Sequence, residues 1–328
     1  MRLLTHAPRS RSLRPSARAV RHSSTASTSD ALNSDTVLLR LPDRHIAYSI
    51  FTPARPVATL FFLHGYPSSR LEAAGLAPLA LERGLRLVSP DRPGFGQSSF
   101  HPYTINNYTR DVLAVADAVG AENFSVLGAS GGGPFALVLA RERRVDKIGL
   151  LATAPPWDGP VNDSSSVRRV AALLAQTPLF APLAAASLAS ARWAVTRPWA
   201  QRRIDAWIAS MSPDTQLDSE LATAQRDAVL RTLLEPFAHG VQGLTHETRL
   251  LTQPWGIDYE EVEREVRFWH AAGDKAAPIS MVRPMVGRLP CAQLTAFEGG
   301  HGDVATILPE VLDYFLPQSA QSGDAGKV

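Results

Sequence analysis

The sequence has very little cysteine, little net charge and no clustered metal ligands. Cys291 is the one cysteine among 328 residues, so an intramolecular disulfide is impossible, as is usual in a reducing compartment. The histidine and cysteine residues show no metal-ligand spacing. A formal net charge of +2 is too small to favour a nucleic-acid partner. We therefore expect neither a metal site nor a nucleic-acid-binding surface.

Acidic residues are missing from residues 1–29, which contain six arginines and many serines. This segment also lacks the continuous apolar run of a secretory signal. Its composition resembles a mitochondrial presequence, and "RHSST" at 21–25 resembles the neighbourhood of a cleavage site. We therefore expect residues 1–35 to be an unstructured targeting segment and the protein to be mitochondrial; the alternative is a disordered basic tail in a cytoplasmic protein.

A long, strongly apolar run is also missing. Residues 171–190 carry no charge, but they contain Pro178 and Pro182, and most of their apolar residues are alanine. A membrane-spanning helix needs about 20 strongly apolar residues. We therefore expect no membrane span, and an apolar helix over a pocket instead.

What the sequence does contain is an alternation of short apolar runs and helix-like stretches. The expected strands are 36–41, 45–51, 58–65, 85–94, 124–130, 146–154, 266–274 and 291–300. The expected helices of this part are 69–82, 105–120, 131–143 and 304–316. Strands that alternate with helices in this way predict an α/β fold with a doubly wound, mostly parallel sheet.

The alternation stops at residues 158–261, which contain no convincing strand and are rich in Ala, Leu and Trp. We interpret this block as a helical cap inserted into a core formed by residues 36–157 and 262–317, followed by a flexible tail at 318–328. The cap supplies candidate apolar pocket walls, and it also carries several arginines. An amphipathic cap that packs on the core is the alternative, and we prefer it for any single one of these residues. The wall candidates are Leu173, Leu174, Phe180, Trp193, Trp199 and Trp207, and the arginines are Arg168, Arg169, Arg202 and Arg203.

The most informative motif is "GASGG" at 128–132, between an expected strand and an expected helix. It fits G-x-S-x-G, in which a sharp turn strains the backbone of the serine. The flanking Gly128 and Gly132 make room for that turn, because a side chain there would clash. The turn presents the Ser130 hydroxyl at the carboxyl edge of the sheet. A tightly packed turn or a phosphate cradle is the alternative interpretation.

A serine nucleophile needs a base, and the base needs an orienting acid. His301 stands in "EGGHGD", after an apolar strand and before the last helix, and Asp274 ends the preceding strand in "GDKAAP". Taken singly, His301 could be a helix cap and Asp274 a turn residue. The order Ser…Asp…His, each at the end of a strand, instead favours a catalytic triad.

Other residues compete for these roles. Asp158 follows another strand and is a second candidate for the acid. We expect His270 to be structural, Asp303 to cap the last helix, and Asp91 with Arg92 to tie loops together.

These motifs together resemble the α/β-hydrolase family, in its serine esterase/haloperoxidase-like branch, over residues 36–317. The matching elements are "HGYP" at 64–67, "DRPGFGQS" at 91–98, "GASGG" at 128–132, "GDKAAP" at 273–278 and "GGHGD" at 299–303. The resemblance implies nucleophile Ser130, acid Asp274 and base His301. It also implies an oxyanion hole made by the backbone N–H groups of Tyr66 and Gly131, with His64 and Gly65 as supporting residues.

The resemblance implies a cofactor-independent hydrolase that cleaves an ester, thioester or related acyl bond. The apolar cap favours a small-molecule substrate with a medium-sized apolar acyl group. Haloalkane dehalogenases and epoxide hydrolases of this family carry aspartate where Ser130 stands, and prolyl aminopeptidases usually carry "HGGPG" where this chain has Tyr66-Pro67. The fold also hosts acyltransferases, lyases and cofactor-free dioxygenases. A ligand-binding protein without activity is a further alternative.

Overall fold

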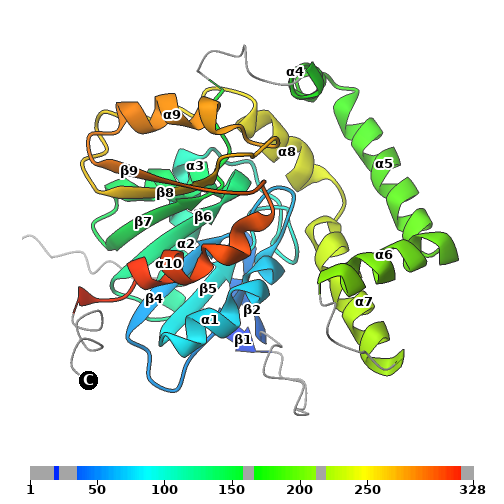
Figure 1. Cartoon of the computed structure of the whole chain (residues 1–328), viewed down its shortest axis with the longest axis horizontal. Helices are drawn as coiled ribbons and strands as arrows, with labels where there is room; N and C mark the ends of the chain where they lie inside the picture. Colours follow the sequence, from blue (N-terminus) through cyan, green and yellow to red (C-terminus); the bar gives the residue numbers. More distant parts are fainter. Residues whose placement is uncertain (1–17, 22–34, 158–165, 212–218, 319–328) are drawn as a thin grey trace, which may run out of the picture.

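The computed structural model describes residues 18–21, 35–157, 166–211 and 219–318. Its centre is a nine-stranded sheet with the order β1-β2-β3-β5-β4-β6-β7-β8-β9 (Figure 1). The six strands from β5 to β9 in this order are mutually parallel. The pairs β1–β2, β2–β3 and β3–β5 are antiparallel. The strands are β1 (Arg18–Arg21), β2 (Asp35–Arg40), β3 (His45–Phe51), β4 (Ala58–Leu63), β5 (Leu85–Pro90), β6 (Phe124–Ala129), β7 (Val145–Leu151), β8 (Val266–Ala271) and β9 (Ala292–Phe297).

The sheet is covered on both faces. Successive residues of a strand point to opposite faces, and accordingly Phe61 belongs to one buried cluster and Phe62 to the other. The cluster around Phe62 includes α1 (Ala77–Glu82) and α10 (Leu308–Tyr314), which lie in front of the sheet in Figure 1. The cluster around Phe61 includes α2 (Thr109–Ala118), α3 (Gly133–Leu137) and α9 (Ile279–Arg288). The predicted doubly wound, mostly parallel sheet is therefore confirmed.

Two elements of this core differ from the sequence-based expectation. The helix α9 was not predicted, because Pro284 lies inside it and a proline normally argues against a helix interior. Within the segment 1–35, which we expected to be unstructured, Arg18–Arg21 forms β1 and pairs with β2. An edge strand such as β2 leaves unpaired backbone groups that an extended segment can bond. The remainder of the expected targeting segment, residues 1–17 and 22–34, lies outside the described residues.

A helical insertion, residues 166–251, separates β7 from β8. It consists of α4 (Ser166–Ala175), α5 (Phe180–Val195), α6 (Pro198–Met211), α7 (Ser219–Leu234) and α8 (Gln242–Leu251). In Figure 1, α8 lies against the core, and α5, α6 and α7 stand on its far side. The uncharged stretch 171–190 is divided between α4 and α5. No helix in the described part of the chain has the length and apolar character to cross a membrane.

The boundary between this insertion and the core lies earlier than expected. Residues 252–261, which the sequence assigns to the cap, include Trp255 and Tyr259, and both are buried in the core cluster around Phe61.

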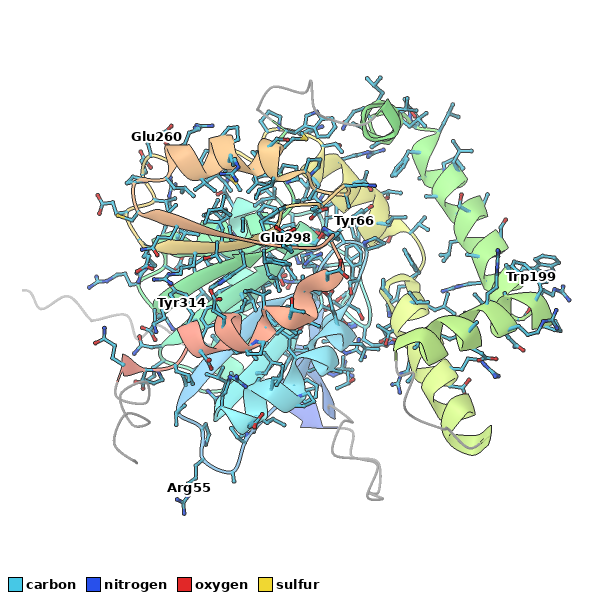
Figure 2. The ribbon with its side chains drawn as sticks, in the orientation of Figure 1. Arg55, Tyr66, Trp199, Glu260, Glu298 and Tyr314 are labelled. Atoms are coloured by element: carbon cyan, nitrogen blue, oxygen red, sulfur yellow. The ribbon has the colours of Figure 1, made fainter. Side chains whose placement is uncertain are left out.

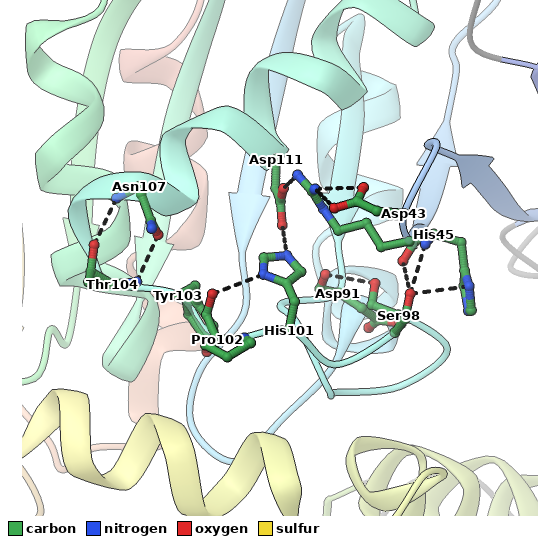
Figure 3. A network of polar contacts seen from close by, with 12 residues as sticks. Asp43, His45, Asp91, Ser98, His101, Pro102, Tyr103, Thr104, Asn107 and Asp111 are labelled. Carbon is green, nitrogen blue, oxygen red and sulfur yellow. Dashed lines mark hydrogen bonds and ion pairs between the residues drawn. The ribbon is translucent and has the colours of Figure 1, made fainter.

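The long loop after β5 is fixed by a network of polar contacts (Figure 3). In it the Ser98 hydroxyl accepts a hydrogen bond from the Ala47 N–H at 2.9 Å. The loop that carries Asp91 and Arg92 is thereby held against β3.

Candidate active site

Ser130 stands at the bend between β6 and the 3₁₀ turn Ser130–Gly132 that precedes α3. Its φ of 46° lies in the left-handed region, which confirms the strained backbone that the motif predicts. A Cβ on Gly128 would come within 2.7 Å of the Ala136 Cβ, and one on Gly132 would overlap the Leu63 carbonyl oxygen. These two positions accept only glycine, so the local sequence and the bend fit one another.

The structure brings Ser130, His301 and Asp274 together at the carboxyl edge of the sheet. The Nε2 atom of His301 lies 3.0 Å from the Ser130 Oγ, and its Nδ1 lies 2.7 Å from Asp274 Oδ2. The other oxygen of Asp274 accepts hydrogen bonds from the backbone N–H groups of Ala276 and Ala277 at 2.9 and 2.8 Å. The three residues thus form one continuous hydrogen-bonded chain.

The electrostatics of this chain suit a base oriented by an ionised acid. Burial acts to raise the pKa of Asp274, but the hydrogen bonds from His301 and Ala277 outweigh it, and the pKa is lowered. The hydrogen bond to Asp274 raises the pKa of His301 against the effect of burial, and the charge of Glu72 adds to the increase. Asp274 is therefore ionised at neutral pH, and His301 is a stronger base than a free histidine.

His270, expected to be structural, lies beneath the acid. Its side chain is fully buried, and its Nε2–H donates to the Ala277 carbonyl oxygen at 2.7 Å. Burial lowers the pKa of His270, which keeps the imidazole neutral. His270 therefore holds the loop that carries Asp274.

The residues expected to form the oxyanion hole are adjacent. A Cβ built on Gly131 would lie 3.2 Å from the Tyr66 backbone nitrogen, so the two backbone segments are in contact. The preceding N–H, of Gly65, donates to Glu72 Oε2 at 2.8 Å. The Tyr66 hydroxyl is hydrogen-bonded to Thr248 of α8. These two contacts fix the part of the loop that carries the Tyr66 N–H.

His64 fixes the same loop from below. Its Nδ1–H donates to the Gly65 carbonyl oxygen at 2.9 Å, and its Nε2 accepts from the Arg92 N–H at 3.3 Å. Burial lowers the pKa of His64 well below its ordinary value. The Arg92 guanidinium donates to the His64 and Gly65 carbonyl oxygens and pairs with Glu247 through two contacts of 2.7 Å. These contacts confirm that Arg92 ties loops together.

The other residues that we considered have different outcomes. Asp91 accepts hydrogen bonds from Arg70 and Gln97, which again joins loops. Asp303 does not cap the last helix: its carboxylate accepts from the Gly300 N–H at 2.7 Å, because it begins a separate 3₁₀ turn. Asp158 lies outside the described residues.

A cavity of about 380 Å³ opens on the Ser130 hydroxyl. Its lining combines the catalytic candidates with small apolar groups and the polar edge of α8. The lining residues are Tyr66, Ser130, Gly131, Ala154, Pro155, Thr248, Leu251, Thr252, Ala276, Ala277 and His301.

The candidate wall residues of the insertion lie away from the Ser130 cavity where the structure describes them. None of them lines this cavity: Phe180 is partly buried elsewhere, and the others are exposed, namely Leu173, Leu174, Trp193 and Trp199. Figure 2 shows Trp199 at the outer end of α6, far from the labelled Tyr66. The side chain of Trp207 lies outside the described residues. Composition identifies an apolar helix but does not tell which of its faces points inward.

Glu72 and Thr248 were not identified from the sequence. Both touch the loop of Tyr66, but Glu72 lies in a helical turn after β4, and Thr248 lies in α8, 182 residues after Tyr66. Neither belongs to a recognisable motif, because their roles come from tertiary contacts alone.

Comparison with known proteins agrees with this architecture. A family model described as alpha/beta hydrolase fold matches residues 58–305, and the chain belongs to that family. A bifunctional esterase/perhydrolase from Acinetobacter calcoaceticus is 33% identical over 31% of this chain and 39% of its own length. Epoxide hydrolase B from Mycobacterium tuberculosis is 32% identical over 30% of this chain and 28% of its own length.

Among solved structures, an esterase from Exiguobacterium antarcticum aligns with a TM-score of 0.57 at 17% identity, over 84% of this chain and 96% of that one. This likeness shows the fold. The chain spans less than half the length of the curated relatives that it matches, so their activities do not pass directly to it.

Proposed function

We propose that the protein is a serine hydrolase that cleaves a carboxylic ester, thioester or related acyl bond through an acyl-enzyme on Ser130. The observation that carries this proposal is the continuous hydrogen-bonded chain Ser130–His301–Asp274, whose serine end opens on the cavity. An isolated serine hydroxyl is a weak nucleophile at neutral pH, and this chain supplies the base that it lacks.

In the first half of the reaction, the Ser130 Oγ attacks the carbonyl carbon of the substrate and His301 Nε2 accepts its proton. The bond between Oγ and carbon forms as the carbonyl π bond opens to an oxyanion. Asp274 accepts the His301 Nδ1–H, which leaves Nε2 free as the base and stabilises the imidazolium that forms. His301 then gives the proton to the leaving group, and the acyl group remains on Ser130.

In the second half, His301 accepts a proton from a water molecule, and the resulting hydroxide attacks the acyl carbon. Collapse of this second tetrahedral intermediate releases the carboxylic acid and returns the proton to Ser130. In both intermediates the oxyanion is held by the backbone N–H groups of Tyr66 and Gly131. Each such donor contributes about 3 kcal/mol of transition-state stabilisation.

The lining of the cavity supports a small to medium apolar acyl group. Ala154, Pro155, Leu251, Ala276 and Ala277 are apolar. A volume of about 380 Å³ is near the lower end of the range for small-molecule sites. An epoxide hydrolase reaction is less well supported, because its alkyl–enzyme ester requires a carboxylate nucleophile and this chain has Ser130 at the bend.

The test is hydrolysis of nitrophenyl esters of increasing acyl length by the wild type, Ser130→Ala and Asp274→Asn. We expect both variants to lose about 10³-fold or more in kcat, since the residues of a triad act as a unit. Ser190→Ala, at an exposed position of α5, is the matched control and should retain activity. Wild-type activity in Ser130→Ala would refute the proposal, and turnover that rises with an added alcohol or thiol would reassign it to an acyltransferase.

A further inference from the structure

We propose that the outer face of the helical insertion docks on the surface of an anionic phospholipid bilayer. We define the outer face by five exposed apolar residues and three arginines of α4, α5, α6 and their connections. These residues are Leu173, Leu179, Leu183, Trp193, Trp199, Arg197, Arg202 and Arg203.

Exposed apolar side chains are concentrated on this insertion. Eight of the nine large apolar side chains that are exposed in the described residues lie between residues 170 and 233. Leu173 is 72% exposed, Leu179 64% and Trp193 59%. The helix α5 has only one charged residue among its sixteen, so its surface is almost entirely uncharged, and yet none of its residues is buried. So much exposed apolar surface in one region marks an interaction site.

The exposed large residues in and beside α5 share one side of the helix. Leu179, Leu183 and Trp193 fall on one stripe of the helical repeat, with exposed small residues between them. Ala184 and Leu188, which are partly buried, are four residues apart and fall on the other side. The helix is therefore two-sided: one apolar side packs on the protein, and the other faces solvent.

The charge of the outer face has one sign. Residues 164–204 contain six arginines and no aspartate or glutamate. The Arg197 guanidinium lies 4.2 Å from the centre of the Trp193 ring, and Arg202 and Arg203 follow Trp199 by three and four residues. No described carboxylate pairs with these three arginines, and the next acid in the chain, Asp205, pairs with Arg226. Cations and indole rings are thus presented side by side.

A lipid surface fits this chemistry better than a second copy of the chain. In a symmetric dimer the same face meets itself, and these arginines would then lie against like charges. An anionic bilayer supplies phosphates for the arginines and an apolar boundary for the leucines and indole rings. A face of this kind lies in the interfacial plane of the bilayer.

The outer face is connected to the rim of the cavity. At the end of α4, the Ala175 carbonyl oxygen accepts from Arg249 Nε at 2.8 Å, and Gln176 Nε2 donates to Thr252 Oγ1 at 3.2 Å. Thr252 lines the cavity. A docked face would bring the cavity close to the bilayer, but the docking does not depend on the reaction proposed for Ser130.

The test is sedimentation of the full chain with phosphatidylcholine vesicles, with and without about one-third phosphatidylglycerol. We expect binding to the anionic vesicles that decreases with salt. The variant Arg202→Glu/Arg203→Glu should lower the partition coefficient onto the anionic vesicles about tenfold or more. The reason is that each basic residue near an anionic membrane surface adds to the affinity of the protein for it. The control variant, Arg55→Glu/Arg143→Glu, makes the same charge change at exposed positions of the core and should bind like the wild type.

Several results would overturn the proposal. One is equal binding by the wild type and Arg202→Glu/Arg203→Glu, which would assign binding to another basic segment such as residues 1–29. Another is no binding of the wild type to anionic vesicles. A wild-type dimer that Trp193→Ala/Trp199→Ala converts to a monomer, seen by light scattering, would assign the face to self-association. Equal thermal midpoints of the variants would show that folding is unchanged.

Discussion

Ser130 holds a backbone conformation that costs about 1–3 kcal/mol in a residue with a side chain. The Ala154 N–H donates to the Ser130 carbonyl oxygen at 2.8 Å and helps to maintain this conformation. The missing side chains of Gly128 and Gly132 leave room for the turn to pack closely on Ala136 and Leu63. The strained residue is also the one whose hydroxyl reaches His301. The backbone strain is therefore located at the residue whose hydroxyl has to point in a fixed direction, toward His301.

The pKa of His301 predicts the pH dependence of activity. Attack by Ser130 needs a neutral imidazole, so kcat/KM should fall as the pH decreases through the His301 pKa. The hydrogen bond to Asp274 raises this pKa above 6.5, and the charge of Glu72 raises it further. We therefore expect the acidic limb of the profile above pH 6.5, and Glu72→Gln should move that limb to lower pH.

The matched control for this profile is Glu82→Gln, which neutralises an exposed carboxylate of α1. It should leave the acidic limb in place. If Glu72→Gln lowers kcat without moving the limb, Glu72 acts only through the Gly65 N–H, and the electrostatic part of this account is wrong.

The residues of the candidate site differ in how well the sequence identifies them. Ser130, Asp274 and His301 each stand in a short motif at the end of an apolar run, so their convergence could be predicted from the alternation of strands and helices. Glu72 and Thr248 could not be predicted, because a lone acid in a turn and a lone threonine in a helix carry no local signal. Their contacts exist only after the chain has folded.

At the scale of elements, the close approach of the Ser130 turn to β4 constrains Gly132. A Cβ on Gly132 would overlap the Leu63 carbonyl oxygen. Because that oxygen belongs to the backbone, no flexible side chain can move to relieve the clash. We expect Gly132→Ala to cost about 3 kcal/mol in the free energy of unfolding, measured by urea denaturation. Gly287→Ala, in α9 with open space around it, should instead stabilise by about 0.5–1 kcal/mol. Equal effects of the two substitutions would contradict the packing described for the turn.

The elements themselves were predictable where burial imposes a pattern. The strands β4 and β6 are buried on both faces, so each appears in the sequence as an apolar run with a single polar residue, Thr59 or Ser125. The helix α9 was missed because Pro284 masks its periodicity, and β1 because it is added at an edge where no burial pattern is required.

At the scale of the whole molecule, a buried ion pair joins the core to the helical insertion. Arg92 follows β5, Glu247 lies in α8, and both side chains are fully buried. The Tyr103 hydroxyl also donates to Glu247 at 2.7 Å. Since Arg92 also donates to the carbonyl oxygens of His64 and Gly65, the positions of α8 and of the loop that carries Tyr66 depend on one another.

We expect Glu247→Gln to cost about 3–5 kcal/mol, because it leaves the Arg92 charge buried without a counterion. The exposed pair Arg141–Glu261 offers a comparison, since Glu261→Gln removes the same charge there and should cost less than about 1 kcal/mol. Urea denaturation of both variants measures this difference. A cost for Glu247→Gln as small as for Glu261→Gln would mean that the pair does not hold the two parts together.

The direction of the insertion's apolar side chains was the least predictable feature of the molecule. Alanine- and leucine-rich helices predict an apolar surface, and the sequence left Trp193 and Trp199 either as pocket walls or as residues that pack on the core. The structure exposes both. The inward and outward sides of such helices are decided by their neighbours, which the periodicity alone does not specify.

The central claim is that His301 activates Ser130, and the most direct test is the intact mass of the protein after exposure to a fluorophosphonate probe. The wild type and Ser190→Ala should each gain one adduct, and Ser130→Ala should gain none. Asp274→Asn should react much more slowly, because its His301 lacks the ionised partner that orients it. A folded wild type that gains no adduct, or an adduct that persists in Ser130→Ala, would contradict the account.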